Sequence, residues 1–290
     1  MEFVSWEISV IVLFPALILC GYIYHKDKIE KEPISLLLIL LVLGAISYVP
    51  VLMLESNILD WIDGVFEDMI SFSADGMIKY GSYAAMHMHK ILTAFIGIAV
   101  IEIAVKWSIL YFCTRNNRNF NYLFDGIVYS VFVSLGFAMV ENIRYAWING
   151  WDMLVLRLLS SLPCHLVVGI IMGYYYTLWN AYNKAKHMEK NYISQGAINE
   201  ERIKYPVDKL ILSILIPLVI TGLFLYVGAI DSKIISTVFY FVVFFMYGVS
   251  FVGVEKIASR DKSSEKFSKK LLQENHPEID PSVGTSVDKE

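Results

Sequence analysis

The sequence predicts an all-α bundle of about seven membrane-spanning helices. Hydrophobic residues make up 56% of the 290 residues and charged residues only 18%, whereas soluble domains average about 45–50% and about 25%. Seven runs are long and apolar enough to cross a hydrocarbon layer roughly 30 Å thick, given a rise of about 1.5 Å per helical residue. We place these spans at residues 7–24, 34–54, 91–113, 123–146, 153–179, 208–229 and 234–254.

The positively charged residues predict the orientation of this bundle. Lys and Arg gather in the loops after the first, third and fifth spans and after the last span, while the other loops hold few. Because short cytoplasmic loops are enriched in Lys and Arg, we expect the N-terminus outside and the C-terminus in the cytoplasm, in the plasma membrane. Residues 1–254 would form one membrane-embedded domain, and the charged residues 255–290 a disordered cytoplasmic tail.

The composition also excludes some classes of protein. No basic stretch carries the interleaved aromatic residues of a nucleic-acid-binding surface, so we expect the lipid bilayer and membrane proteins as partners and no nucleic acid. Cys20, Cys113 and Cys164 lie in or beside apolar runs. Their spacing fits neither a disulfide framework nor a CxxC metal site.

Four ionisable residues inside the predicted spans are the candidates for function. They are Glu102 and Lys106 in the third span, Glu141 in the fourth and His165 in the fifth. A charge at the bilayer centre costs about 2.5–3.5 kcal/mol on insertion scales, so an intramembrane ionisable residue is a functional candidate by default. Each residue also has a structural alternative, as an ion pair of Glu102 with Lys106 on one helix face or as a polar clamp between helices.

Taken together, these residues can form a hydrolytic site. Two carboxylates and one imidazole on three consecutive spans can meet at one point inside the bilayer. Glu141 and His165 can bind a divalent metal, with zinc as the expected ion, while Glu102 activates a water molecule. Lys106 would keep Glu102 ionised by opposing the effect of burial. The spacing alone does not establish this site.

At these residues the sequence resembles the PrsW family of membrane-embedded proteases, which is related to the CAAX-processing and bacteriocin-maturation membrane proteases. Residues 24–33 (YHKDKIEKEP) resemble the family's linker ending in Glu-Pro, and residues 102–106 (EIAVK) resemble its EExxK motif. The most specific stretch is residues 124–129 (FDGIVY) with residues 136–145 (GFAMVENIRY), which resembles the DGxxY and FxxxEN region. His165 resembles the histidine of the family's next span.

This resemblance implies an endopeptidase that cleaves another membrane protein. The role that this resemblance implies is the first cut of a single-span anti-sigma factor on its outer side. It implies Glu102 as the base, with Glu141 and His165 as metal ligands or oxyanion stabilisers. The supporting residues, which would set the charge of Glu102 or position nearby groups, are Lys106, Phe137, Asn142 and Arg144.

The chain departs from the family pattern at two places. Ile103 stands where the EExxK motif has its second glutamate. In the sixth span, Thr221 and Leu225 stand where the family often carries a further histidine and an acid. Two alternatives therefore stay open beside an active protease. One is a pseudoprotease that binds a membrane partner in immunity or signalling, and the other is an ion or proton channel or carrier.

Overall fold

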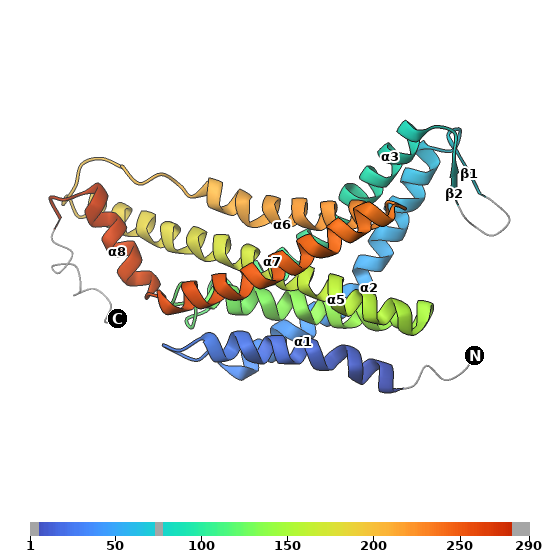
Figure 1. Cartoon of the computed structure of the whole chain (residues 1–290). Helices are drawn as coiled ribbons and strands as arrows, with labels where there is room; N and C mark the ends of the chain where they lie inside the picture. Colours follow the sequence, from blue (N-terminus) through green and yellow to red (C-terminus); the bar gives the residue numbers. More distant parts are fainter. Residues whose placement is uncertain (1–5, 73–77, 280–290) are drawn as a thin grey trace.

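The computed structural model describes residues 6–72 and 78–279 as a bundle of long helices (Figure 1). Five membrane-length helices are α1 (Trp6–Lys26), α2 (Ile34–Val65), α5 (Asp125–Ser194), α6 (Val207–Gly228) and α7 (Lys233–Ser259). A sixth is the continuous rod of α3 (Tyr83–Leu92), the π-helix η1 (Thr93–Ala99) and α4 (Val100–Thr114). The strands β1 (Ile70–Phe72) and β2 (Ile78–Tyr80) pair as an antiparallel hairpin after α2.

Six helices in the described residues are long and apolar enough to cross a membrane, which confirms the all-α membrane bundle. The spans predicted at 123–146 and 153–179 are the two halves of α5. This helix folds back at Gly150, whose φ is 80°, a backbone conformation that glycine adopts readily. With α5 counted twice, the chain passes along the bundle seven times. We call the end that carries β1 and β2 the hairpin end.

Two glycines let the central helices approach closely. Gly136 of α5 lies against the backbone of Leu41 in α2, and Gly173 lies against Gly126, where the two halves of α5 cross. A Cβ atom at Gly136 or Gly173 would overlap a backbone oxygen of the neighbouring helix. Small residues permit such packing between membrane helices. The two halves of α5 therefore lie at the centre of the bundle.

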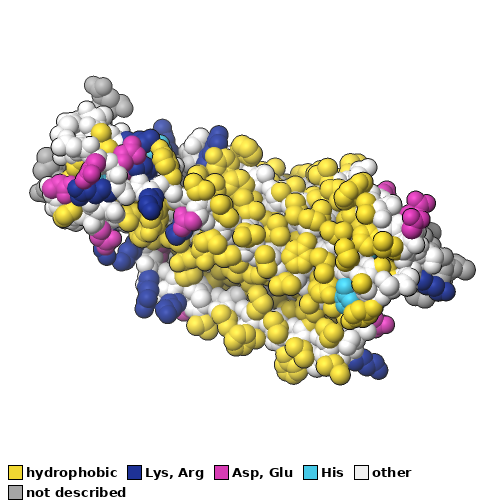
Figure 2. Space-filling view, turned by 90° about the horizontal axis from the view of Figure 1, so that it is seen from above, with side chains coloured by type: hydrophobic (Ala, Val, Ile, Leu, Met, Phe, Trp, Pro, Cys, Tyr) yellow, Lys and Arg dark blue, Asp and Glu magenta, His cyan; other side chains and the backbone are white. Residues whose placement is uncertain are grey.

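The surface has the pattern expected of a protein in lipid. Figure 2 shows a broad apolar surface across the middle of the bundle, with charged side chains gathered toward its two ends. A continuous apolar surface of this kind is rare on soluble monomers. Exposed apolar side chains occur on several helices and include Phe14, Leu38, Phe112, Phe241 and Phe245.

The expectation that residues 255–290 form a disordered tail is wrong for much of that segment. α7 continues to Ser259, and α8 (Ser264–Asn275) packs along the last turns of α5. Leu272 is buried in a small apolar cluster with Ile198 and Ile203. The charged composition conceals this helix because its few apolar anchors have their partners in a distant loop. Residues 280–290 lie outside the described residues.

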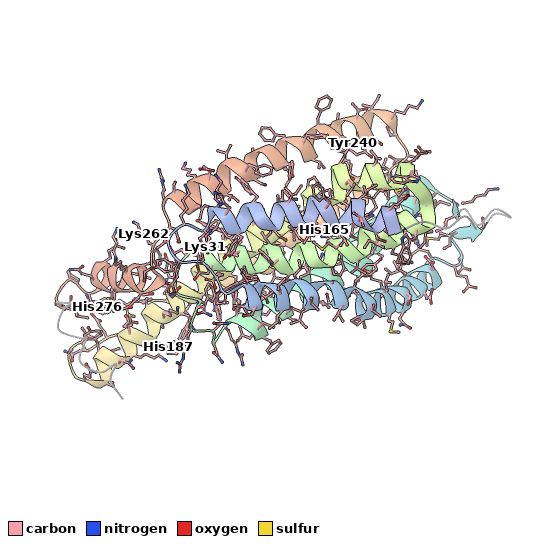
Figure 3. The ribbon with its side chains drawn as sticks, turned by 90° about the horizontal axis from the view of Figure 1, so that it is seen from below. Lys31, His165, His187, Tyr240, Lys262 and His276 are labelled. Carbon is pink, nitrogen blue, oxygen red and sulfur yellow. The ribbon has the colours of Figure 1, made fainter. Side chains whose placement is uncertain are left out.

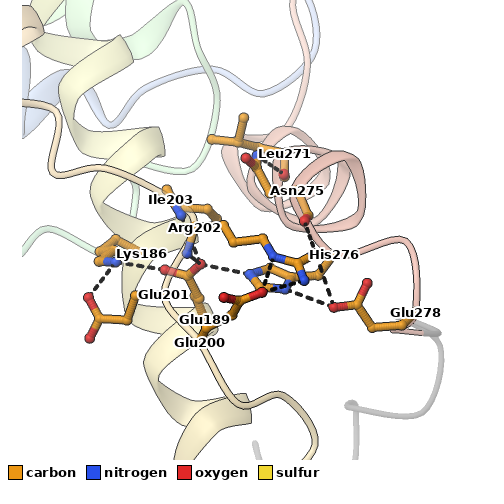
Figure 4. Close-up of polar contacts among 10 residues, drawn as sticks. All are labelled: Lys186, Glu189, Glu200, Glu201, Arg202, Ile203, Leu271, Asn275, His276 and Glu278. Carbon is orange, nitrogen blue, oxygen red and sulfur yellow. Dashed lines mark hydrogen bonds and ion pairs between the residues drawn. The ribbon is translucent and has the colours of Figure 1, made fainter.

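Polar contacts also hold α8 in place, at what we call the α8 end of the bundle. Figure 4 shows Glu189 of α5 between two partners. Glu189 Oε1 lies 2.7 Å from His276 Nε2, and Glu189 Oε2 lies 2.7 Å from Lys186 Nζ. Arg202 and Ile203 donate their backbone amides to the same carboxylate. The end of α5, the following loop and the segment after α8 thus meet at one buried side chain.

Candidate active site

The four ionisable residues singled out in the sequence lie together inside the bundle. Glu102 and Lys106 project from α4, Glu141 from the first half of α5 and His165 from its second half. Their side chains are between 1% and 9% exposed. Figure 3 shows His165 midway along the bundle. The fold thus brings residues from three passes of the chain to one buried place.

These side chains form one continuous chain of polar contacts. Lys106 Nζ lies 2.5 Å from Glu102 Oε2 and 3.3 Å from His165 Nδ1. His165 Nε2 lies 2.9 Å from Glu141 Oε2. An ammonium group can only donate, so His165 Nδ1 accepts from Lys106 and Nε2 donates its proton to Glu141. This arrangement assigns a neutral imidazole with its proton on Nε2.

Arg157 completes the network. Its Nη2 lies 2.6 Å from Glu141 Oε1, and its Nε donates to Asn142 Oδ1 at 2.7 Å. Two carboxylates, Glu102 and Glu141, therefore face two cations, Lys106 and Arg157. We call these four residues and His165 the central network. The inward direction of Arg157 was not predictable from its position, because a long side chain near a predicted turn can equally reach the membrane interface.

Neighbouring side chains fix the orientation of the central network. Ser134 Oγ donates to the carbonyl oxygen of His165 at 2.8 Å, which joins the two halves of α5. The Phe137 ring lies 5.9 Å from the His165 ring between centroids, and Lys106 Nζ lies 3.9 Å from the Phe137 centroid. A cation over an aromatic face is attracted by the ring quadrupole. Phe137 thus holds both Lys106 and His165.

The other two predicted supporting residues differ in position. Asn142 is fully buried and contacts Arg157, so it belongs to the edge of the central network. Arg144 lies farther out, where its Nη1 is 3.4 Å from the hydroxyl of Tyr48. We therefore assign Arg144 to the surroundings of the site.

A further carboxylate lies beside the central network. Glu55 of α2 interacts electrostatically with Glu102, Glu141 and Lys106. The second span was predicted to end at residue 54, which left Glu55 in a loop. α2 continues to Val65, so Glu55 is part of a helix of the bundle.

The departures from the family motifs lie apart from these contacts. Ile103 is fully buried in the apolar core, among residues of α1, α2 and α5. Its side chain packs in that core, so a glutamate there would not join the central network without rearrangement. Thr221 is buried in α6, next to Gly222, which packs on the Phe95 ring.

The Glu141–His165 pair, as arranged, does not fit a metal ion. Both oxygens of Glu141 and both ring nitrogens of His165 already face polar partners. Two of these partners are the cations Lys106 and Arg157, which repel a metal. Catalytic zinc sites usually have three protein ligands.

The chain is similar to known membrane proteases. The family described as "PrsW family intramembrane metalloprotease" matches residues 32–251. Protease PrsW of Oceanobacillus iheyensis is 34% identical over 177 residues, which cover 61% of this chain and 70% of that protein. Protease PrsW of Clostridioides difficile is 25% identical over 262 residues, which cover 88% and 93%.

Protease PrsW of Bacillus subtilis is 29% identical over 161 residues, which cover 56% of this chain and 63% of that protein. No solved structure matches the chain. The matched family region includes every residue of the central network and extends from the start of α2 into α7. On this match, the chain belongs to the PrsW family of intramembrane metalloproteases.

Proposed function

We propose that the chain hydrolyses a peptide bond of another membrane protein, with Glu102 as the general base. The central network is the observation that supports this proposal. It joins a carboxylate, an ammonium group, a neutral imidazole and a second carboxylate by direct contacts in the interior of the bundle. Ionisable groups at such depth are rare and are functional candidates.

The proposed reaction uses the chain's own residues. Lys106 holds one oxygen of Glu102, and the other oxygen can accept a proton from a water molecule that attacks the scissile carbonyl carbon. The Lys106 ammonium group supplies positive charge for the developing oxyanion. When the C–N bond breaks, Glu102 returns the proton to the leaving nitrogen. Glu141 and Arg157 keep the His165 imidazole in place beside Lys106.

We propose a substrate with a single membrane span, such as an anti-sigma factor, cut on its outer side in the plasma membrane. An apolar cavity of about 500 Å³ lies between the second half of α5, α6 and α7. Cys164, the neighbour of His165, lines it together with apolar side chains such as Phe224 and Val238. An apolar helix is the occupant that suits such a lining.

Replacing Glu102 by Gln tests the proposed base. Gln keeps the volume and can still accept from Lys106, but it cannot take up a proton, so cleavage should slow by roughly 10²–10⁴. The assay follows a single-span reporter protein in liposomes, with Glu67→Gln, an exposed carboxylate at the hairpin end, as the control. Cleavage at the parent rate would reduce Glu102 to the structural partner of Lys106.

The same liposomes separate the two alternatives. A parent protein that binds the reporter without cutting it would be a pseudoprotease. A parent protein that passes protons or cations, with loss of flux in Glu102→Gln, would be a channel or carrier.

A bulky side chain in the apolar cavity tests the proposed substrate site. Val238→Trp would partly fill the cavity, and we expect kcat/KM to fall roughly tenfold, which corresponds to about 1.4 kcal/mol of lost binding. The matched control is Phe241→Trp, an exposed position on the same helix outside the lining. Equal effects of the two variants would exclude this cavity as the substrate site.

Zinc at Glu141 and His165 stays a prediction. It requires Lys106 and Arg157 to withdraw from these side chains. Metal analysis of the purified protein tests it directly, since zinc bound there should disappear in His165→Asn and persist in His187→Asn.

A further inference from the structure

Three carboxylates meet at the α8 end, away from the central network. Asp27 directly follows α1, Glu32 lies just before α2, and Asp125 is the first residue of α5. Each offers an oxygen atom, and these atoms all lie within 4.8 Å of one another. The three residues are 1%, 3% and 0% exposed. Figure 3 labels Lys31, the neighbour of Glu32, at this end of the bundle.

Several oxygens of this acidic cluster have no partner. Asp125 Oδ2 accepts the backbone amides of Asn121 and Tyr122, at 2.9 and 2.7 Å. The Tyr129 hydroxyl donates to Glu32. Asp125 Oδ1 and both oxygens of Asp27, however, are buried without a hydrogen-bond partner among the described residues. Such groups are few in native proteins and point to an ion or water that satisfies them.

The nearby cations are used elsewhere. Lys184 faces Asp125 electrostatically, but its Nζ donates to the carbonyl oxygen of Phe120 and the hydroxyl of Ser264. Lys31 interacts electrostatically with Asp27, but its Nζ donates to the carbonyl oxygen of Tyr24. Among the described residues, the three buried carboxylates thus share one place without a cation in direct contact with them.

A fourth carboxylate of the region has another role. Asp261, in the turn between α7 and α8, accepts the backbone amides of Phe124 and Lys262 through Oδ1. The Leu123 amide also donates to the carbonyl oxygen of Lys262, at 3.0 Å. The acidic cluster therefore sits where the ends of α1 and α2, the start of α5 and the α7–α8 turn meet.

We propose that Asp27, Glu32 and Asp125 bind a divalent cation of the Mg²⁺, Mn²⁺ and Ca²⁺ class. These hard ions prefer carboxylate oxygens, whereas zinc sites in proteins are built mainly from His and Cys. The cation uses the free oxygens of Asp27 and Asp125 and offsets the mutual repulsion of the three carboxylates. Water molecules or backbone carbonyls complete its coordination.

The consequence of binding is structural. The cation joins the linker between α1 and α2 to the start of α5, next to the crossing of Gly126 with Gly173. A ligand that binds only the folded state stabilises it. The site therefore fastens the α8 end of the bundle, and this role holds whether or not the central network cleaves peptides.

Mn²⁺ binding to the purified full-length chain tests the proposal. After treatment with a chelator, the protein should bind one Mn²⁺ per chain, measured by electron paramagnetic resonance, and Mg²⁺ and Ca²⁺ should displace it. Asp27→Asn and Asp125→Asn should each weaken binding by at least about tenfold, the scale of losses at metal sites. The control is Glu274→Gln, an exposed carboxylate of α8 that pairs with Lys270, which should bind like the parent.

Three results would overturn the proposal: no saturable Mn²⁺ binding by the parent, unchanged affinity in both Asn variants, or binding of zinc alone that His165→Asn abolishes. If either Asn variant fails to fold, Glu32→Gln takes its place, because Gln still accepts from the Tyr129 hydroxyl. Retained affinity in a folded Glu32→Gln would count against the site. Loss of affinity with a parent-like thermal unfolding curve in chelator would support it.

Discussion

The central network and the acidic cluster are both buried and both built from carboxylates, yet they solve the problem of buried charge differently. In the central network, Glu102 and Glu141 face Lys106 and Arg157. In the acidic cluster, Asp27 has two oxygens without a partner. In the central network, cations of the chain itself balance the negative charge. In the acidic cluster, the proposed divalent cation would balance it. Burial alone therefore does not reveal the role of an acidic residue.

The two sites should respond in opposite ways, in folding stability, to the loss of one charged group. Removing one partner of a balanced pair leaves an uncompensated buried charge and costs about 3–5 kcal/mol. Removing a carboxylate from an unbalanced cluster relieves repulsion.

The largest effect is expected for Arg157→Met. Met keeps much of the length but leaves Glu141 without its cation, so unfolding free energy should fall by about 3–5 kcal/mol. Unfolding in mixed micelles with increasing dodecyl sulfate measures it. The double variant Glu141→Gln, Arg157→Met should recover most of the loss, because it removes both charges. Additive losses in the double variant would show that the two side chains act independently.

A smaller loss is expected for Ile103→Glu, which restores the second glutamate of the family motif. Because Ile103 lies in the apolar core, the new carboxyl group would be buried without a partner and cost about 1–3 kcal/mol. Cleavage should not increase. Ile103→Gln controls for polarity without charge. A gain in activity in Ile103→Glu would mean that position 103 can turn toward the central network and that the parent is the weakened form.

The smallest change in stability is expected for Asp27→Asn, and it is a gain. In the presence of chelator, Asp27→Asn should raise the unfolding free energy by about 0.5–1.5 kcal/mol, the net worth of a typical hydrogen bond. The Asn amide can donate to the neighbouring carboxylates, whereas Asp27 only repels them. Thermal unfolding in detergent measures the change, and Glu274→Gln, an exposed carboxylate of α8, is expected to stay near the parent. A loss of stability in Asp27→Asn would mean that Asp27 stabilises the fold even without a cation.

The sequence predicted the passes of the chain well because each is a long apolar run. It also singled out Glu102, Lys106, Glu141 and His165, since an ionisable residue within such a run is conspicuous. Their convergence needed the fold, because the contacts from Lys106 to His165 and from His165 to Glu141 join different helices. Nothing in local spacing fixes such contacts.

The residues that sequence reasoning missed lie near the ends of apolar runs. Arg157 and Glu55 fall where a charged side chain is ordinary, so their direction into the bundle depends on how far each helix continues. α8 was missed because its few apolar residues stand in a charged segment, and Leu272 packs on a distant loop. Asp27 and Asp125 belong to segments that resembled family motifs, but only the folded chain brings them together.

The turn at Gly150 has a consequence for how the protein is made. Glu141 and Arg157, which form an ion pair of the central network, are carried by the two arms of a single helical hairpin. During insertion, each would otherwise meet lipid as an isolated charge at about 2.5–3.5 kcal/mol. If both arms leave the translocon together, the pair enters the bilayer already neutralised. The free-energy cost of insertion then depends less on the order in which the two arms are synthesised than on their joint release into the bilayer.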